Sequence, residues 1–293
     1  MTERLADVQA RIASIEELHE IVGAMRGLAA MRSQEAIRGL ASTRAYADIV
    51  GAALARAASL MPEAPSLAPS ADHRLPRGIV LFFAEHSFAG AFNDRVIAEI
   101  EPRGRDLLFA VGSRGALVCE ERHITLAWST PMASHVNALA ATARRISSEL
   151  YRRFSSGEIG GVDIVFARHQ GGARSSVVRR ALLPVEGLRA APETAIAPLI
   201  NLPPAALVEQ MLEEYLLGEL AHAAMESFAS ENAARLATMQ SARRNIEEKL
   251  VELRMSEHRL RQEQITGELL DVATGAAALA PEGIDGAATA PHP

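Results

Sequence analysis

The sequence has a single lysine, a single cysteine and few aromatic residues. Lys249 is followed by leucine within a helical pattern, so no phosphate-binding loop ending in Gly-Lys-Ser/Thr is present. Cys119 alone cannot form an intramolecular disulfide or a metal cluster, which fits a reducing compartment. Aromatic residues make up 4% of a chain that is rich in Ala, Leu, Glu and Arg, and this favours long helices over a β-sandwich core.

Excess positive charge and long hydrophobic runs are missing as well. The formal net charge is −6, so there is no general basic field to hold nucleic acid, and we expect no such partner. No run of about eighteen apolar residues occurs. The segment MTERLADVQARI is charged from its third residue, so we expect neither a secretory signal nor direct membrane insertion. Binding to a membrane assembly through a partner remains open.

Recognisable catalytic and ligand-binding motifs are also lacking. The histidines are scattered without metal-ligand spacing, and GxSxG does not occur. The glycines of GSRG at 112–115 and of Gly171-Gly172 are interpreted as turn residues, with a phosphate site as the minor alternative. Glu85-His86-Ser87 is interpreted as a polar turn. We therefore expect no cofactor, no metal and no catalytic residue.

The first part of the chain is predicted to be one long helix, over residues 1–60. It contains no proline, and its apolar residues recur every three or four positions, which defines one face of a helix. Four prolines then predict a linker at 61–77. The apolar positions are Leu5, Val8, Ile12, Ile15, Leu18, Val22, Met25 and Leu28.

Residues 78–200 change to short apolar runs that alternate with helical patterns, which predicts a mostly parallel α/β sheet. Only RHQGGARS joins the last two runs, so these two are predicted to form an antiparallel edge hairpin. The expected strands lie at 78–84, 105–111, 123–128, 162–167 and 175–185, and the expected helices at 90–102, 113–121 and 133–156.

The last part is predicted to be a second long helix at 204–278, followed by a flexible tail at 279–293. At about 1.5 Å per residue this helix would be on the order of 110 Å long, which a domain of this size cannot bury. Its apolar residues follow heptad steps, typical of a left-handed coiled coil, and the N-terminal helix is the natural antiparallel partner. The predicted seam consists of Ile12, Ile15, Val22, Leu236, Met239, Ile246, Leu250, Leu253 and Leu260, with Arg243 and Glu257 as register-setting polar residues.

The fold class predicted from these parts is α/β: an antiparallel coiled coil of long N- and C-terminal helices plus a mostly parallel, Rossmann-like α/β domain. Small residues concentrate in the N-terminal helix, at Gly23, Ala24, Gly27, Ala29 and Ala30. They would let the two helices approach closely, or let a surrounding protein wall approach them. The simpler alternative is that they fill a tight core.

Two segments at opposite ends of the chain carry a family resemblance. RIASIEELHEIVGAMRGLAAMR at the start, and MESFASENAARLATMQSARRN with RQEQITGELLDVATGAAAL at the end, resemble the terminal signatures of the gamma subunit of rotary F-type ATP synthases. The resemblance covers residues from about 4 to 279. The matching positions near the C-terminus include Ser230-Glu231, Ala234-Arg235, Met239, Asn245, Arg261-Gln262, Ile265-Thr266, Glu268-Leu269 and Gly275.

The sequence also departs from the family pattern. Glu20-Ile21-Val22 stands where the family usually has Lys-Ile-Thr, and EHSFAGAFN keeps Gly90 and Asn93 but loses the usual Asp-Arg-Gly-Leu-Cys. These departures indicate a divergent bacterial branch, for which the alternate, sodium-linked type is one candidate.

The resemblance implies a non-catalytic rotor shaft. Its implied partners are three alpha and three beta subunits, the epsilon subunit and the membrane c-ring, and its implied place is the cytoplasmic face of the bacterial inner membrane as a peripheral protein. The transported ion, H⁺ or Na⁺, is set by other subunits. The apolar C-terminal tip is implied to act as a bearing. The implied partner contacts are Met25, Arg235, Arg261, Gln262, Ile265, Thr266 and Leu269.

Two other functions fit the sequence less well. One is a coiled-coil scaffold or adaptor unrelated to ATPases, whose α/β domain binds another protein. The other is a small-molecule enzyme that uses residues 78–200. The missing catalytic and nucleotide-binding motifs argue against the enzyme, and the two terminal signatures argue against both.

Overall fold

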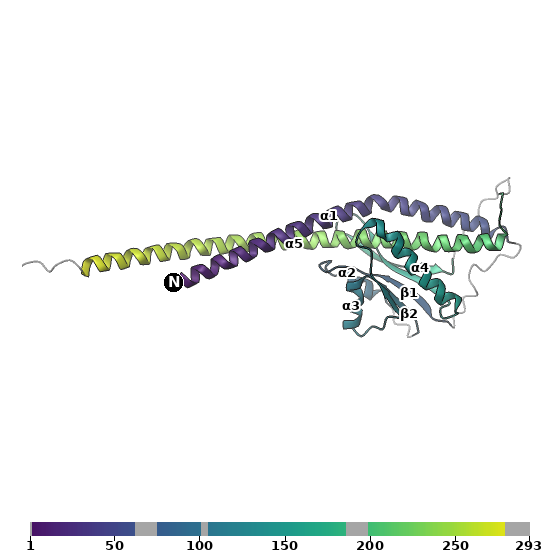
Figure 1. The fold of residues 1–293 in the computed structure, drawn as a ribbon, viewed down its shortest axis with the longest axis horizontal. Coiled ribbons are helices and arrows are strands. Elements are labelled where there is room, and N and C mark those ends of the chain that lie inside the picture. The colour runs from purple at the N-terminus through teal and green to yellow at the C-terminus, as the bar shows by residue number, and fades with distance from the viewer. Residues whose placement is uncertain (1, 62–74, 101–104, 186–198, 279–293) are drawn as a thin grey trace, which may run out of the picture. The chain divides into compact units, whose positions relative to one another are not determined.

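The structure is a computed structural model that describes residues 2–61, 75–100, 105–185 and 199–278 (Figure 1). Most of the predicted linker at 61–77, much of the segment before Pro204 and the predicted tail at 279–293 lie outside the described residues. The chain forms two compact units. One consists of Met1–Val22 and Ala242–Pro293, the other of Gly23–Ser241.

Two long helices contribute residues to both units: α1, Thr2–Ala58, and α5, Pro204–Ala278. Between them the chain forms a five-stranded sheet with three helices and a 3-10 turn. The elements are β1 (Arg77–Phe82), α2 (Phe92–Ala98), β2 (Leu107–Val111), α3 (Ser113–Glu121), β3 (Trp128–Thr130), η1 (Val136–Ala138), α4 (Leu139–Ser155), β4 (Gly161–His169) and β5 (Ser175–Leu183).

The sheet has the strand order β3-β2-β1-β4-β5. The first four strands are parallel, and β5 is antiparallel to β4 at the edge. Val80 of β1 faces Phe109 on one neighbour and Ile164 on the other, which fixes the register at the centre. The predicted fold class is therefore confirmed: long terminal helices with a mostly parallel sheet that ends in an antiparallel hairpin.

The third strand differs from its prediction. The apolar run at 123–128 predicted a strand there, but β3 covers only Trp128–Thr130. His123 has a φ of 57°, and the Ile124 N–H donates to the carbonyl of Cys119, so this run closes helix α3. Ile124 and Leu126 are apolar because they pack against the core beneath α2 and α3.

Helices cover the two faces of the sheet from different parts of the chain. One face packs against α4 and α5 through a core that includes Phe82, Phe109, Ile146 and Leu220. The other packs against α2 and α3 through Phe83, Phe92 and their neighbours. The strand order explains this division: the first two crossovers step away from β1 in one direction and the third returns in the other, so right-handed connections place their helices on opposite faces.

In the unit of Gly23–Ser241, α1 and α5 approach closely at glycines other than those predicted. A Cβ built on Gly39 would lie 3.0 Å from the Met225 side chain, and one on Gly218 would lie 3.2 Å from the Tyr46 ring. At Gly23 and Gly27 nothing lies within 4 Å of such an atom, so the predicted close helix contact at these two positions is wrong for the described residues. Of the predicted small residues, Ala29 is the one that is fully buried.

In the other unit, the start of α1 pairs with the last part of α5 in antiparallel orientation. Gln9 Nε2 donates to Glu257 at 3.0 Å, and His19 Nε2 lies 3.3 Å from Glu247, so residue numbers fall along α5 as they rise along α1. Leu18, expected on the apolar face, is 47% exposed, and His19 takes the inward position.

The positions proposed for the seam differ in burial. Val22, Met239, Ile246 and Leu250 are buried. The partly buried ones are Ile12, Ile15, Leu236, Leu253 and Leu260.

None of the helices within the described ranges combines the length and apolar character needed to cross a membrane.

A buried histidine lies between α1 and α5. His222 is 6% exposed, with its Nδ1 3.1 Å from the Thr43 hydroxyl and its Nε2 3.8 Å from Glu226. Burial lowers its pKa below 6.5, and the nearby Glu226 carboxylate only partly opposes this. The folded state therefore favours the neutral ring, whose contribution to stability is complete above pH 6.5 and is lost as the pH falls through the folded pKa.

Acidification should therefore destabilise the chain partly through this residue. We expect His222→Gln to reduce the loss of unfolding free energy between about pH 7.5 and 5.5, because glutamine does not titrate. Urea unfolding at the two pH values measures this. His135→Gln, at an exposed histidine, is the matched control for the substitution itself. Equal pH dependence of His222→Gln and the wild type would contradict the assignment.

Gly115 of α3 is required by close packing against Phe83, the residue that follows β1. A Cβ at this position would lie 2.1 Å from both Cβ and Cγ of Phe83, which is fully buried. We expect Gly115→Ala to destabilise the chain by about 3 kcal/mol, the upper end of the usual cost of overpacking. Gly23→Ala, at a helical glycine with open space, should instead be neutral or stabilise by up to about 1 kcal/mol. Thermal and chemical unfolding compare the two variants, and equal stabilities would contradict the packing argument.

Candidate functional site

The carboxyl ends of β1 and β4 lie where the strand order reverses, which is where open α/β sheets usually bind ligands. In this protein, buried polar residues of α5 are hydrogen-bonded there instead. We call Glu226, Ser227, Ser230, Glu231 and Arg235 the polar row. All five are between 1% and 8% exposed. They lie on one side of a helix that is otherwise rich in small apolar residues.

The first half of the polar row bonds to the end of β4. Strand β4 pairs with β1 only as far as Val165. Beyond that point the Ala167 N–H donates to Ser227 Oγ at 3.1 Å, and Ser230 Oγ donates to the Ala167 carbonyl at 3.1 Å. The His169 N–H donates to Glu226 Oε2 at 2.8 Å. Side chains of α5 thus occupy the hydrogen-bonding places that a neighbouring strand would take.

The second half of the polar row holds the loop that follows β1. Arg235 Nε donates to the Ser87 carbonyl at 3.1 Å, and Nη2 donates to the His86 carbonyl at 3.0 Å. Nη2 also donates to Glu231 at 2.6 Å, and Nη1 donates to Asn232 at 3.2 Å. Four hydrogen bonds to its own chain therefore hold the guanidinium group, and its planar array of donors fixes the shape of the loop.

The start of α3, where a phosphate commonly binds in such folds, is capped by a carboxylate of this chain. Glu85 accepts from the Ser113 N–H at 2.9 Å, from the Ser113 hydroxyl at 2.8 Å and from the Met132 N–H at 2.7 Å. The negative charge of Glu85 thus takes the place that the helix N-terminus would offer to an anion. The interpretation of both glycines of GSRG as turn residues holds for Gly112, which lies in the bend before α3, and is wrong for Gly115, which lies in the helix and packs against Phe83.

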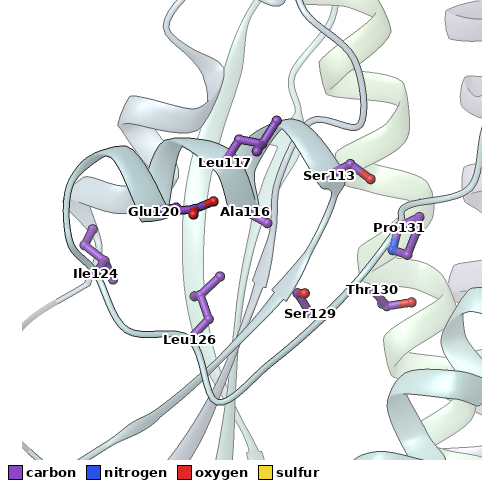
Figure 2. Close-up of a pocket in the computed structure, with 9 residues that line it drawn as sticks. All are labelled: Ser113, Ala116, Leu117, Glu120, Ile124, Leu126, Ser129, Thr130 and Pro131. Atoms are coloured by element: carbon purple, nitrogen blue, oxygen red, sulfur yellow. The ribbon is translucent and has the colours of Figure 1, made fainter.

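A hollow of about 570 Å³ lies beside α3. Figure 2 shows its lining side chains coming from α3 and from the segment 124–131 opposite, with Leu117, Ile124 and Leu126 among them. Ser113 lies at its rim, but its N–H and hydroxyl already donate to Glu85. The hollow is mainly apolar, and Glu120 is the charged residue of its lining. These features do not favour a phosphate-bearing ligand.

A second hollow, of about 310 Å³, is lined by residues of α1, of the loop after β1 and of α5. Its apolar part comes from Met25, Leu28, Ala29 and Phe88. Phe88 has a φ of 65°, a left-handed conformation that costs free energy in a residue other than glycine, and its side chain is 59% exposed. The loop, held by Arg235, thus presents an aromatic ring at the surface. Arg32, His86, Ser87, Asn232 and Arg235 complete the lining.

The structure brings two of the predicted contact residues together in the unit of Gly23–Ser241. Met25 and Arg235 both line the second hollow. The others belong to the last part of α5, in the other unit. There Arg261 donates to Glu257 at 2.7 Å, and Thr266 Oγ1 donates to the carbonyl of Gln262 at 2.8 Å. All of these remaining residues are exposed: Arg261, Gln262, Ile265, Thr266 and Leu269.

The sequence analysis missed Glu226 and Ser227, and it named Ser230 only as a position of the family signature, without its bond to β4. A signal for them exists. Polar residues at positions 226, 227, 230, 231 and 235 recur on one side of a helix whose other residues are mostly small and apolar. Within the described ranges, no three His, Cys, Asp or Glu side chains gather as metal ligands.

Comparisons with known proteins agree on one family. The family model for ATP synthase matches residues 4–279. The ATP synthase gamma chain of Anaeromyxobacter dehalogenans is 28% identical over 289 residues, covering 94% of this chain and 99% of the relative. The gamma chain of Moorella thermoacetica is 27% identical over 282 residues, with the same coverage of both chains.

Solved structures show the same fold. One chain of the Euglena gracilis mitochondrial ATP synthase, in a structure of OSCP, F1 and c-ring, matches with a TM-score of 0.66 at 12% identity, covering 99% of this chain and all of that one. A chain from the central stalk and c-ring of the Tetrahymena thermophila enzyme matches with a TM-score of 0.55 at 18% identity, covering 76% of this chain and 99% of that one. The family match over residues 4–279 shows that this chain belongs to the ATP synthase family, and within it to the gamma chains that its relatives represent.

Proposed function

We propose that this chain is the central rotor shaft of an F-type ATP synthase. It couples ion-driven rotation of the membrane ring to ATP synthesis or hydrolysis in a ring of three alpha and three beta subunits. The observation that carries the proposal is the family match over residues 4–279, with gamma chains as relatives along 99% of their length. The chain has no catalytic role of its own and acts by changing its angle inside the ring.

The end of α5 supports a bearing role. Gln9 faces Glu257, so among the described residues those of α5 beyond about Gln264 have no α1 residue opposite them. This end still carries large apolar side chains: Ile265, Leu269, Leu270 and Val272 are 51% to 70% exposed. A partner with apolar walls would bury them from every side. Apolar contacts are non-directional, so they hold the tip on its axis without favouring one angle.

The second hollow supports a contact with a catalytic subunit. Met25, Leu28 and Phe88 offer an apolar surface, and the half-buried Arg32 adds positive charge beside it. A partner segment that combines an apolar side chain with a carboxylate fits this surface. Arg235 stays a predicted contact at this hollow, and its bonds to the loop keep Phe88 in place. The open space around Gly23 and Gly27 is consistent with a partner wall on that side of α1.

Rotation changes nucleotide affinity because the shaft is asymmetric. The hollow lies on one side of the chain, so at any angle the three beta subunits meet different surfaces. A contact made in one conformation of a beta subunit and not in another shifts the population of that subunit. We assign the contacts with the c-ring and the epsilon subunit to the α/β domain. We further propose that the chain is a peripheral protein at the cytoplasmic face of the bacterial inner membrane. Ion choice, H⁺ or Na⁺, belongs to the membrane subunits.

The proposal is tested by reconstitution with and without this chain. Alpha and beta subunits are combined with stripped membranes that hold the c-ring. The isolated chain should hydrolyse no ATP, the ring without it should keep a residual rate, and ATP-driven ion pumping should require it. The measurements are ATP hydrolysis and ion uptake by the vesicles. Ion pumping of equal size without this chain, or failure of the chain to co-assemble, would overturn the proposal.

Charge at the tip should impair the shaft without affecting its fold. We expect Leu269→Glu with Leu270→Glu to lower coupled ATP synthesis by about ten-fold or more, because two carboxylates would be buried without partners in an apolar sleeve. Both leucines are exposed in the isolated chain, so its melting temperature should not change. Ile49→Glu, at an isoleucine of α1 that is 68% exposed, is the control and should leave synthesis unchanged. Unchanged synthesis by the double variant would contradict the bearing role.

A further inference from the structure

We propose that Glu226, Ser227 and Ser230 are positioning residues that transmit torque between α5 and the sheet. We call the hydrogen bonds from these three residues to β4 the junction. This inference rests on the proposed function, because only a rotating chain puts a load on the junction. It assigns to three hydrogen bonds a mechanical role that is separate from the contacts with the catalytic subunits. The geometry points to these residues because they alone in the polar row bond directly to a strand of the sheet.

The junction acts on the strand best placed to spread a load. Strand β4 is bonded to β1 over its first half and to β5 along its whole length. Its last residues, Ala167 and His169, have α5 side chains where β1 no longer reaches. A displacement of α5 therefore pulls directly on the β4 backbone, and the ladders on both sides of β4 pass the force to the other strands.

Packing holds this part of α5 only partly. Phe228 and Met225 are buried in the core, but the other buried apolar residues beside the serines are small: Ala223, Ala224, Ala229 and Ala233 are at most 4% exposed. Short side chains interlock little with their neighbours, so packing leaves part of the resistance to sliding to other contacts. The hydrogen bonds are directional, and breaking them would leave buried backbone groups without partners. Together with the ion pair between Glu219 and Arg180 of β5, they fix the helix in register with the sheet.

The test uses the assembled complex in membrane vesicles, with Ser227→Ala and Ser230→Ala combined. Removing both hydroxyls leaves the N–H and carbonyl of Ala167 unpaired, so hydrogen exchange of the Ala167 amide should rise by about ten-fold or more. ATP hydrolysis should stay within about two-fold of the wild type, whereas the number of ions pumped per ATP should fall by at least about two-fold. Ser241→Ala, at an exposed serine of the same helix, should change none of these quantities.

A second pair of variants covers the case in which the double variant does not assemble. Glu226→Gln keeps an acceptor for the His169 N–H and should keep the wild-type number of ions per ATP. Glu226→Ala removes the acceptor and should lower that number. Rescue by glutamine separates positioning from the loss of a charge, and a melting curve of each complex shows whether it is folded at the assay temperature.

The mechanical role of the junction is contradicted by three possible results. Faster exchange at Ala167 with an unchanged number of ions per ATP would show that the junction is only structural and would overturn the inference. The same holds if hydrolysis and pumping fall in parallel, or if Glu226→Ala and Glu226→Gln pump equally. Failure of the proposed function looks different, since the wild-type chain would then not assemble or pumping would not depend on it.

Discussion

The hydrogen bonds from the polar row of α5 to the backbone around β1 and β4 are the constraint on which the unit of Gly23–Ser241 depends. Two segments leave the regular ladder here: β4 extends beyond its pairing with β1, and the chain after β1 turns away from the sheet. Both leave backbone groups that must find partners once buried. The polar row provides those partners from a helix that begins after both segments in the sequence. Helix position, loop shape and sheet edge are thus fixed together, and none could shift without exposing unpaired groups in the others.

Local sequence patterns predicted those helices and strands whose apolar residues all face one core or one partner helix. The two long helices and strands β1, β2, β4 and β5 follow from heptad spacing, proline positions and apolar runs. The strand predicted at 123–128 was wrong because Ile124 and Leu126 cover a core without pairing with a strand. An apolar residue can cover a core from a loop or from a strand, and apolarity alone does not distinguish the two. Leu18 was predicted wrongly for a similar reason. A step of three from Ile15 reaches Leu18 and a step of four reaches His19. Both steps fit a helix, and the partner helix decides which residue faces inward.

The site was harder to predict, because its hydrogen bonds join residues far apart in the sequence. The resemblance singled out Arg235 as important, but its acceptors include carbonyls of a loop 148 and 149 positions earlier, and no local pattern places that loop beside α5. Glu85 is similar. It looked like part of a polar turn, and its role appears only when the ends of β1 and β3 and the start of α3 meet. A polar residue's function in a buried site is set by the backbone groups that tertiary structure brings to it.

These internal bonds also explain how a fold associated with ligand binding can serve a mechanical role. In an open α/β sheet, the switch point and the first turns of the helices are where polar backbone groups are left over, and a ligand ordinarily satisfies them. Here α5 fills the switch point and Glu85 caps α3, so the same groups are satisfied within the chain. A site that is permanently occupied does not open and close with ligand concentration, so its stiffness is constant. A part that passes rotation to a strand requires constant stiffness. The same internal bonds leave no room for a ligand at the edge of the sheet where related folds bind theirs.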